Sequence, residues 1–184
     1  MENQDYGSEG VIWHAYSPRL MKKIIELFPK EIPVIDLGCG LNNYVNILCY
    51  LGYEAHGYDY TDLGSKNFTI ANLAYPLYPV QGKTKFIKNV ISLEVGEHIP
   101  EHLADVYLDN LTMHGGDIIM SWAVEGQAGI GHVNCRNNDW VIVEMHKRGY
   151  KLEGNRTADL RAAVADCHAN WFKETLMYFI PAYF

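Results

Sequence analysis

Residues 34–43 read VIDLGCGLNN, a short strand-like run that leads into two glycines one residue apart. This pattern predicts a buried parallel strand and a tight turn into a helix, because glycine lets the backbone turn sharply and approach a ligand. The dinucleotide fingerprint G-x-G-x-x-G would need a third glycine where this chain has Asn43. Asp36, just before the glycines, disfavours a pyrophosphate and suits a ligand with an ammonium and a sulfonium group. We therefore predict a nucleoside-binding turn, with an ordinary strand–helix turn as the alternative.

Strand-like and helix-like segments alternate along the rest of the chain. Alternation of this kind predicts a doubly wound, mostly parallel α/β sheet. The segment TDLGSKN, between the second and third strands, is too short for a full helix, and the last two strands favour an antiparallel arrangement at one edge. The spacing predicts helices over 18–28, 44–51, 100–111, 139–148 and 159–169, and strands over 33–37, 54–58, 66–71, 86–93, 117–123, 151–155 and 175–182.

Composition limits the class of protein. The 184 residues, 48% of them hydrophobic, fit one globular domain: residues 1–30 form an N-terminal segment and helix, a candidate lid, and residues 31–184 form the core. A net charge of −7 argues against a nucleic-acid partner held by bulk electrostatics. None of the four cysteines lies in a C-x-x-C pair, so we predict no metal site and reduced thiols in the cytoplasm. No apolar run approaches the roughly 20 residues that span a membrane.

Ligands of such a sheet bind beyond the carboxyl ends of its strands. Asp59 ends the second predicted strand, 23 residues after Asp36, where an acid accepts hydrogen bonds from ribose hydroxyls. Enzymes that bind NAD share this device, so Asp59 predicts a nucleoside without saying which one. Tyr60 could lie against the adenine. Asn72 ends the third strand, where it could pair with the adenine amine or simply form a turn before a proline.

Candidate acid–base residues follow the fourth and fifth strands. Glu97 and His98, in the stretch VISLEVGEHIP, could orient a substrate or accept its proton, or they could cap the helix that follows. His132 lies in a long glycine-rich loop that faces the substrate in this kind of fold; an ordinary surface histidine is the alternative. Trp122 and Asn134 lie near it in sequence and could form a wall and a polar contact for the substrate.

Three motifs together resemble the class I S-adenosylmethionine-dependent methyltransferases. They are D-L-G-C-G, the acid Asp59 after the second strand, and S-L-E-V-G-E-H-I-P, and the resemblance to the small-molecule branch called type 11 or type 12 covers roughly residues 33–184. It implies a Rossmann-like seven-stranded sheet of order 3-2-1-4-5-7-6, with strand 7 antiparallel and helices on both faces, and S-adenosylmethionine as the cofactor. The short second crossover departs from the family, and so does Asn72, where the family has an acid.

The resemblance also implies roles for individual residues around the cofactor. Trp13, His14 and Tyr16 precede the first helix, where relatives often fold a lid, and Trp13 is a candidate substrate contact or a core residue. The expected cofactor residues are Gly38, Cys39 and Gly40 along the methionine part, Asp36 near its amino group, Asp59 at the ribose, Asn72 and Leu73 beside the adenine, and Glu94 at the methionyl end.

We therefore predict methyl transfer to a small-molecule or sugar-like acceptor. The sulfonium methyl is already activated, so the enzyme mainly aligns the reactants, and a base is needed only if the acceptor is a hydroxyl or protonated amine. Glu97, His98 and His132 are the candidate bases. No N-P-P-Y, D-P-P-Y or P-C motif follows the fourth strand, which disfavours nucleic-acid methylation. An NAD-type oxidoreductase and a catalytically silent cofactor-binding scaffold are the alternatives.

Overall fold

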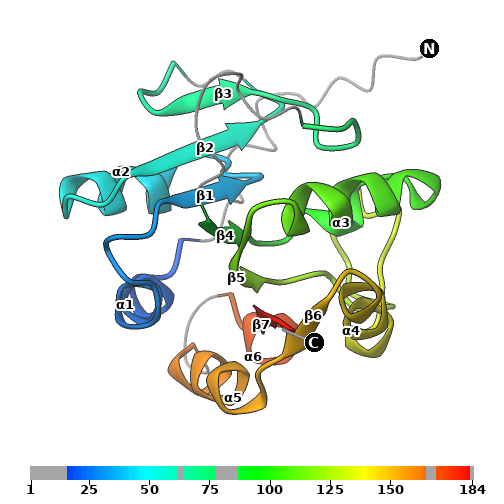
Figure 1. Ribbon diagram of the computed structural model, residues 1–184. Helices are drawn as coiled ribbons and strands as arrows, with labels where there is room; N and C mark the ends of the chain where they lie inside the picture. Colours follow the sequence, from blue (N-terminus) through cyan, green and yellow to red (C-terminus); the bar gives the residue numbers. More distant parts are fainter. Residues whose placement is uncertain (1–15, 62–63, 78–86, 165–168, 183–184) are drawn as a thin grey trace.

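The computed structural model describes residues 16–61, 64–77, 87–164 and 169–182, in which seven strands form a single sheet (Figure 1). Their order is β3-β2-β1-β4-β5-β7-β6, and β7 runs antiparallel to both β5 and β6 while the other neighbours pair in parallel. The predicted topology is therefore confirmed. The strands are β1 Val34–Leu37, β2 Ala55–Asp59, β3 Phe68–Ile70, β4 Lys88–Ser92, β5 Gly115–Met120, β6 Tyr150–Leu152 and β7 Met177–Pro181.

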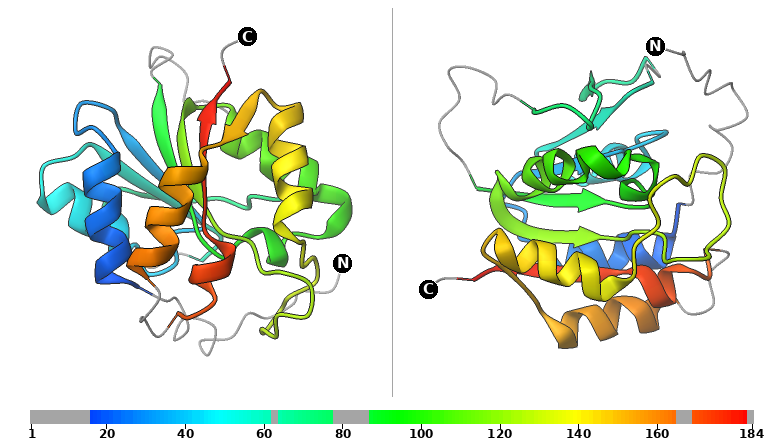
Figure 2. Two further views of the ribbon diagram at one scale, coloured as in Figure 1. Left: turned by 90° about the horizontal axis from the view of Figure 1, so that it is seen from below. Right: turned by 90° about the vertical axis from the view of Figure 1, so that its right-hand side faces the viewer.

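Helices cover both faces of the sheet and make two separate cores (Figures 1 and 2). On one face, Leu20 and Leu48 pack with Ile91 of β4, and on the other, Ile35 of β1 packs with Leu108. The strands alternate their side chains between two buried faces, which is why they read as nearly continuous apolar runs. The first face carries α1 Pro18–Leu27, α2 Asn43–Tyr50, α5 Gly154–Ala163 and the short α6 Phe172–Thr175, and the second carries α3 Ala104–Thr112 and α4 Asn138–Lys147.

The start of α1 agrees with the capping pattern in the sequence. Ser17 is the N-cap, its Oγ accepts a hydrogen bond of 3.2 Å from the Leu20 N–H, and Pro18 occupies the first helical position. The Ser17 N–H donates to the hydroxyl of Tyr44, 3.1 Å away, and so ties α1 to the beginning of α2. Two of the three residues of the predicted lid, Trp13 and His14, lie outside the described residues.

The largest errors of the sequence prediction fall near the C-terminus. The strand predicted over 151–155 ends at Leu152, and the helix predicted over 159–169 begins at Gly154 and ends at Ala163. The cause is a side-chain cap: Glu153 accepts a hydrogen bond of 2.7 Å from the Arg156 N–H and starts the helix five residues early. The four-residue helix α6 was not predicted.

Two further predictions concern the helix that precedes β5 and the crossover between β2 and β3. The helix predicted over 100–111 is divided into a 3-10 turn, η3 Glu101–Leu103, and α3. Between β2 and β3, the described residues 60–61 and 64–67 form no helix, which agrees with the predicted short crossover. Among the described helices, none has the length and apolarity needed to cross a membrane.

Candidate functional site

The turn between β1 and α2 is built around two glycines and an asparagine. Gly38 has φ of +87°, and a Cβ there would overlap the side chain of Val95, so the position needs glycine for both reasons. Gly40 and Asn42 are also left-handed, and Asn42 is the N-cap of α2, which begins at Asn43. Asn43 is therefore the first residue of α2, and its position does not require glycine as the third position of a dinucleotide fingerprint would.

Two carboxylates lie at the carboxyl ends of β1 and β2, beside this turn. Asp36 is 2% exposed, whereas Asp59 is half-buried and accepts hydrogen bonds from the N–H groups of Gly40, at 2.9 Å, and Thr61, at 3.3 Å. Burial, and then the charge of Asp59, raise the pKa of Asp36 to about 8. A cationic group bound between them would reverse this effect, so the pair suits a ligand with an ammonium and ribose hydroxyls.

The residues expected around the adenine follow β2 and β3. Leu73 is buried and Tyr60 is exposed, and the structure places both beyond the strand ends as predicted from sequence. The side-chain oxygen of exposed Asn72 accepts a hydrogen bond of 3.0 Å from the Ala74 N–H, so Asn72 forms the turn that was one of its two predicted roles. Asn110 of α3 holds this segment by donating to the backbone oxygen of Leu73 at 3.0 Å.

Glu94 lies two residues after the end of β4, in a backbone conformation that is uncommon for residues other than glycine. Its φ is +54°, its N–H donates to Ser121 Oγ at 2.9 Å, and its two carboxylate oxygens accept from Gln127 at 2.8 Å and from Thr175 at 3.4 Å. Burial raises the pKa of Glu94. Backbone strain of this kind persists only where surrounding contacts enforce it, and it often marks a functional position. Sequence reasoning missed Gln127 and Thr175, because nothing local links them to Glu94.

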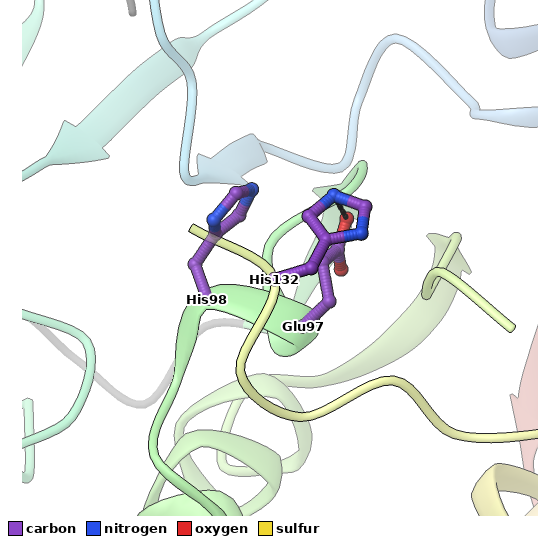
Figure 3. A group of neighbouring side chains, drawn as sticks. All are labelled: Glu97, His98 and His132. Carbon is purple, nitrogen blue, oxygen red and sulfur yellow. Dashed lines mark ion pairs between the residues drawn. The ribbon is translucent and has the colours of Figure 1, made fainter. Parts of the chain in front are cut away.

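Glu97, His98 and His132, the three predicted acid–base residues, come together in one group (Figure 3). Glu97 and His98 lie on a 3-10 turn, η2 Gly96–His98, while His132 comes from the loop after β5. The Val133 and Asn134 N–H groups donate to the Glu97 backbone oxygen at 2.8 and 3.0 Å and attach the loop to η2. His132 Nε2 lies 3.9 Å from Glu97 Oε1, and the two imidazole ring centres are 5.1 Å apart.

The Glu97 carboxylate is completely buried. Among the described residues, neither of its oxygens has a hydrogen-bond partner. Burial, and then the charge of Glu94, raise the pKa of Glu97 to about 8, although the backbone amides of Glu97 and Ala123 oppose this in part. A buried carboxylate that nearby amides stabilise only in part is costly unless a proton or a cation compensates it.

The structure corrects the predicted substrate wall. Trp122 is fully buried in the core between the rings of Tyr107 and Trp140, and its Nε1–H donates to the Asn134 backbone oxygen at 2.6 Å. Asn134 is itself 4% exposed, with its side-chain oxygen bonded to Arg136. These two residues therefore support the loop that carries His132 from below and do not face an open surface. Trp13, the third expected substrate contact, lies outside the described residues.

Comparison with known proteins supports the class of fold. No protein-family model matches the chain, and neither does any curated protein. A TehB-like S-adenosylmethionine-dependent methyltransferase from Corynebacterium glutamicum matches with a TM-score of 0.61 and 14% identity, over 94% of this chain and 93% of the other. Magnesium protoporphyrin IX methyltransferase from Synechocystis PCC 6803, with bound S-adenosylhomocysteine, matches with a TM-score of 0.54 and 18% identity, over 73% of this chain and 71% of the other.

The chain therefore has the fold of the class I S-adenosylmethionine-dependent methyltransferases, as its motifs predicted. The [4+2]-cyclase SpnF shares this fold, with a TM-score of 0.59 and 13% identity over 90% of this chain and 81% of the other. Because the same fold supports different chemistry, function must be argued from the site.

Proposed function

We propose that the protein binds S-adenosylmethionine beyond the carboxyl ends of β1 and β2 and transfers its methyl group to a small-molecule acceptor, with sugar-like compounds included. The observation that carries the proposal is the arrangement of Asp36 and Asp59 on either side of the Gly38–Gly40 turn. A cofactor with an ammonium, a sulfonium and two ribose hydroxyls offers groups that match both carboxylates. Two of the similar structures are named as methyltransferases, which supports the same conclusion.

Each cofactor residue has a physical role in this proposal. The ammonium lies near Asp36, directly or through water, and the ribose hydroxyls donate to Asp59. The backbone at Gly38 and Gly40 gives the methionine part close approach, and Glu94 lies beside the methionyl end. Burial raises the pKa of Cys39 far above its usual value, so its thiol stays protonated and contributes a small apolar surface, not a nucleophile.

Transfer itself needs alignment more than acid–base power. The acceptor atom forms a bond to the methyl carbon as the carbon–sulfur bond breaks, and the electron pair of that bond neutralises the sulfonium and leaves S-adenosylhomocysteine. A hydroxyl acceptor gives up its proton, and the group of Glu97, His98 and His132 is where we place its removal. The loop that carries His132 is then the segment that recognises the acceptor. The net charge of −7 favours a small acceptor over nucleic acid.

Calorimetry with S-adenosylmethionine, S-adenosylhomocysteine and NAD tests the cofactor. We expect both adenosyl compounds to bind and NAD not to bind, because Asp36 disfavours a pyrophosphate. Binding of NAD alone would replace the proposal by an oxidoreductase.

Formation of S-adenosylhomocysteine with a panel of hydroxylated and amino small molecules and sugars then tests the reaction. We expect turnover with at least one compound. Binding of S-adenosylmethionine without turnover on the whole panel would favour a silent cofactor-binding protein, or a non-methylating enzyme such as the [4+2]-cyclase neighbour.

A further inference from the structure

One carboxylate and two imidazoles converge beside the proposed acceptor position. Glu97, His98 and His132 each offer one ligand atom, and these atoms all lie within 4.8 Å of one another (Figure 3). We propose that these three residues bind one divalent transition-metal ion. The sequence predicted no metal, because its cysteines form no C-x-x-C pair, and His132 follows His98 only after 34 residues.

The first argument is the state of Glu97. Its side chain is fully buried, and neither carboxylate oxygen has a hydrogen-bond partner among the described residues. Native proteins rarely leave such a group without compensation, because desolvation of a carboxylate costs several kcal/mol. The imidazole of His132 lies close, but its Nε2 is 3.9 Å from Oε1, too long for a hydrogen bond, and the backbone amides of Glu97 and Ala123 offset the burial only in part. A cation held between the two groups would satisfy both.

The second argument is the orientation of the two imidazoles. His98 Nδ1 lies 3.2 Å from the backbone oxygen of Gly131, and His132 Nδ1 lies 3.1 Å from that of Gln127. A carbonyl oxygen only accepts, so each contact places a proton on Nδ1, and in the neutral ring the lone pair is then on Nε2. Metal-binding histidines are normally fixed in this way, with the second ring N–H bonded to a carbonyl or carboxylate. In both neutral rings, Nε2 is therefore the nitrogen with which the side chain can bind an ion.

The third argument is the fit of the backbone around the group. The hydrogen bonds from Val133 and Asn134 to the Glu97 backbone oxygen hold His132 over η2. The His132 ring lies against Gly129, where any Cβ would overlap it. Ligand atoms about 2.0–2.1 Å from a tetrahedral ion are about 3.4 Å apart. The 3.9 Å separation of His132 Nε2 and Glu97 Oε1 is about half an ångström longer than this. The remaining separations lie within 4.8 Å, so binding an ion requires the side chains to close by at most about 1.4 Å.

The donor set selects the kind of ion. Two imidazoles with one carboxylate suit zinc, iron(II), cobalt(II) or nickel(II) better than magnesium or calcium, which prefer oxygen ligands. Three protein ligands leave a coordination position for another molecule, as in catalytic metal sites. If the proposed methyl transfer holds, that position suits an acceptor hydroxyl, which would release its proton more readily when bound to the ion. This last step rests on the proposed function; binding of the ion does not.

Metal titration of chelator-treated protein tests the site directly. Zinc chloride is followed by calorimetry and cobalt(II) chloride by its visible absorption, which reports the coordination geometry. We expect one equivalent per chain for the wild type. We expect at least tenfold weaker binding for Glu97→Gln, His98→Ala and His132→Ala, and unchanged binding for His102→Ala, which removes an exposed imidazole of η3 outside the group.

Three results would overturn the proposal: no zinc or cobalt binding by the wild type, wild-type affinity in all three ligand variants, or an equal loss in His102→Ala. Circular dichroism establishes which variants are folded, and Glu97→Gln removes the charge at nearly constant shape. S-adenosylmethionine affinity is measured on the same metal-free samples. Cofactor binding without metal binding would reject the metal site alone, and metal binding without cofactor binding would reject the proposed function alone.

Discussion

The two halves of the proposed site are built differently. On the cofactor side, Gly38, Gly40 and Asp59 come from two neighbouring parallel strands, and the Gly40–Asp59 hydrogen bond links residues 19 apart. Toward the acceptor side, Glu94, which we place at the methionyl end of the cofactor, is bound by residues 33 and 81 positions away, and Glu97 is bound by the loop after β5. A site made of strand ends is fixed by the sheet, whereas a site that depends on a loop can change its specificity without disturbing the fold.

The largest expected effect is on the rate of methyl transfer, and it separates the acceptor side of the site from the cofactor side. His132→Ala should slow methyl transfer about 100-fold or more, because the variant lacks either the base or a metal ligand, and should change S-adenosylmethionine affinity less than twofold. Initial rates with an active acceptor and calorimetry measure the two quantities, with His102→Ala as the control. A variant that loses cofactor affinity but keeps its rate would move His132 to the cofactor half.

The second effect concerns the cofactor half. Asp59→Ala should weaken S-adenosylmethionine binding about tenfold or more, because two charge-assisted hydrogen bonds to the ribose are lost. Calorimetry on the variant measures this, and Asp159→Ala, an exposed acid on α5, serves as the matched control. Equal affinities in Asp59→Ala and the wild type would show that Asp59 does not hold the ribose.

Asp36, on the cofactor side, should make the free energy of unfolding of the protein depend on pH. Its pKa is about 8 in the folded protein and about 4 in the unfolded chain, so the folded state binds the extra proton between these values and stability falls as pH rises. From pH 6 to pH 8, the titration of Asp36 alone should lower the free energy of unfolding by about 2 kcal/mol. The Asp36→Asn variant should lack this part of the pH dependence. Urea unfolding at both pH values compares the two proteins, and identical pH dependence would contradict the assignment.

The same titration predicts how the cofactor binds. The cofactor ammonium favours ionised Asp36, so S-adenosylmethionine affinity should rise between pH 6 and pH 8 in the wild type. The rise should be absent in Asp36→Asn. Calorimetry at three pH values checks this, and a rise that persists in the variant would point to another group.

The smallest effect concerns the helix that packs beside the cofactor half. Ser17→Ala should lower the free energy of unfolding by about 1 kcal/mol, because the Leu20 N–H loses its cap. Cofactor affinity should not change, since the substitution keeps the Ser17 N–H and its hydrogen bond to Tyr44 at the beginning of α2. Urea unfolding and calorimetry separate these outcomes, and a large loss of affinity would give α1 a direct part in the site.

Prediction from sequence succeeded where local physics decides. The cap at Ser17, the start of α2 after the glycine turn and the acid that ends β2 all follow from the residues within a few positions. The sheet order, which the family resemblance implied, is also confirmed. It failed at residues 151–169, where a single glutamate cap moved a helix, and at Trp122, which is fully buried between Tyr107 and Trp140.

By itself, the sequence determined the strand–turn–helix unit at residues 34–50 and the acids around it, because glycine conformation, apolar runs and strand ends are local properties. Only the tertiary structure decided that Glu97, His98 and His132 form one group, and that Gln127 and Thr175 bind Glu94. These contacts depend on where the loop after β5 and the short helix α6 pack against the end of β4. Such returns are set by packing over the whole domain, which no spacing in the sequence records.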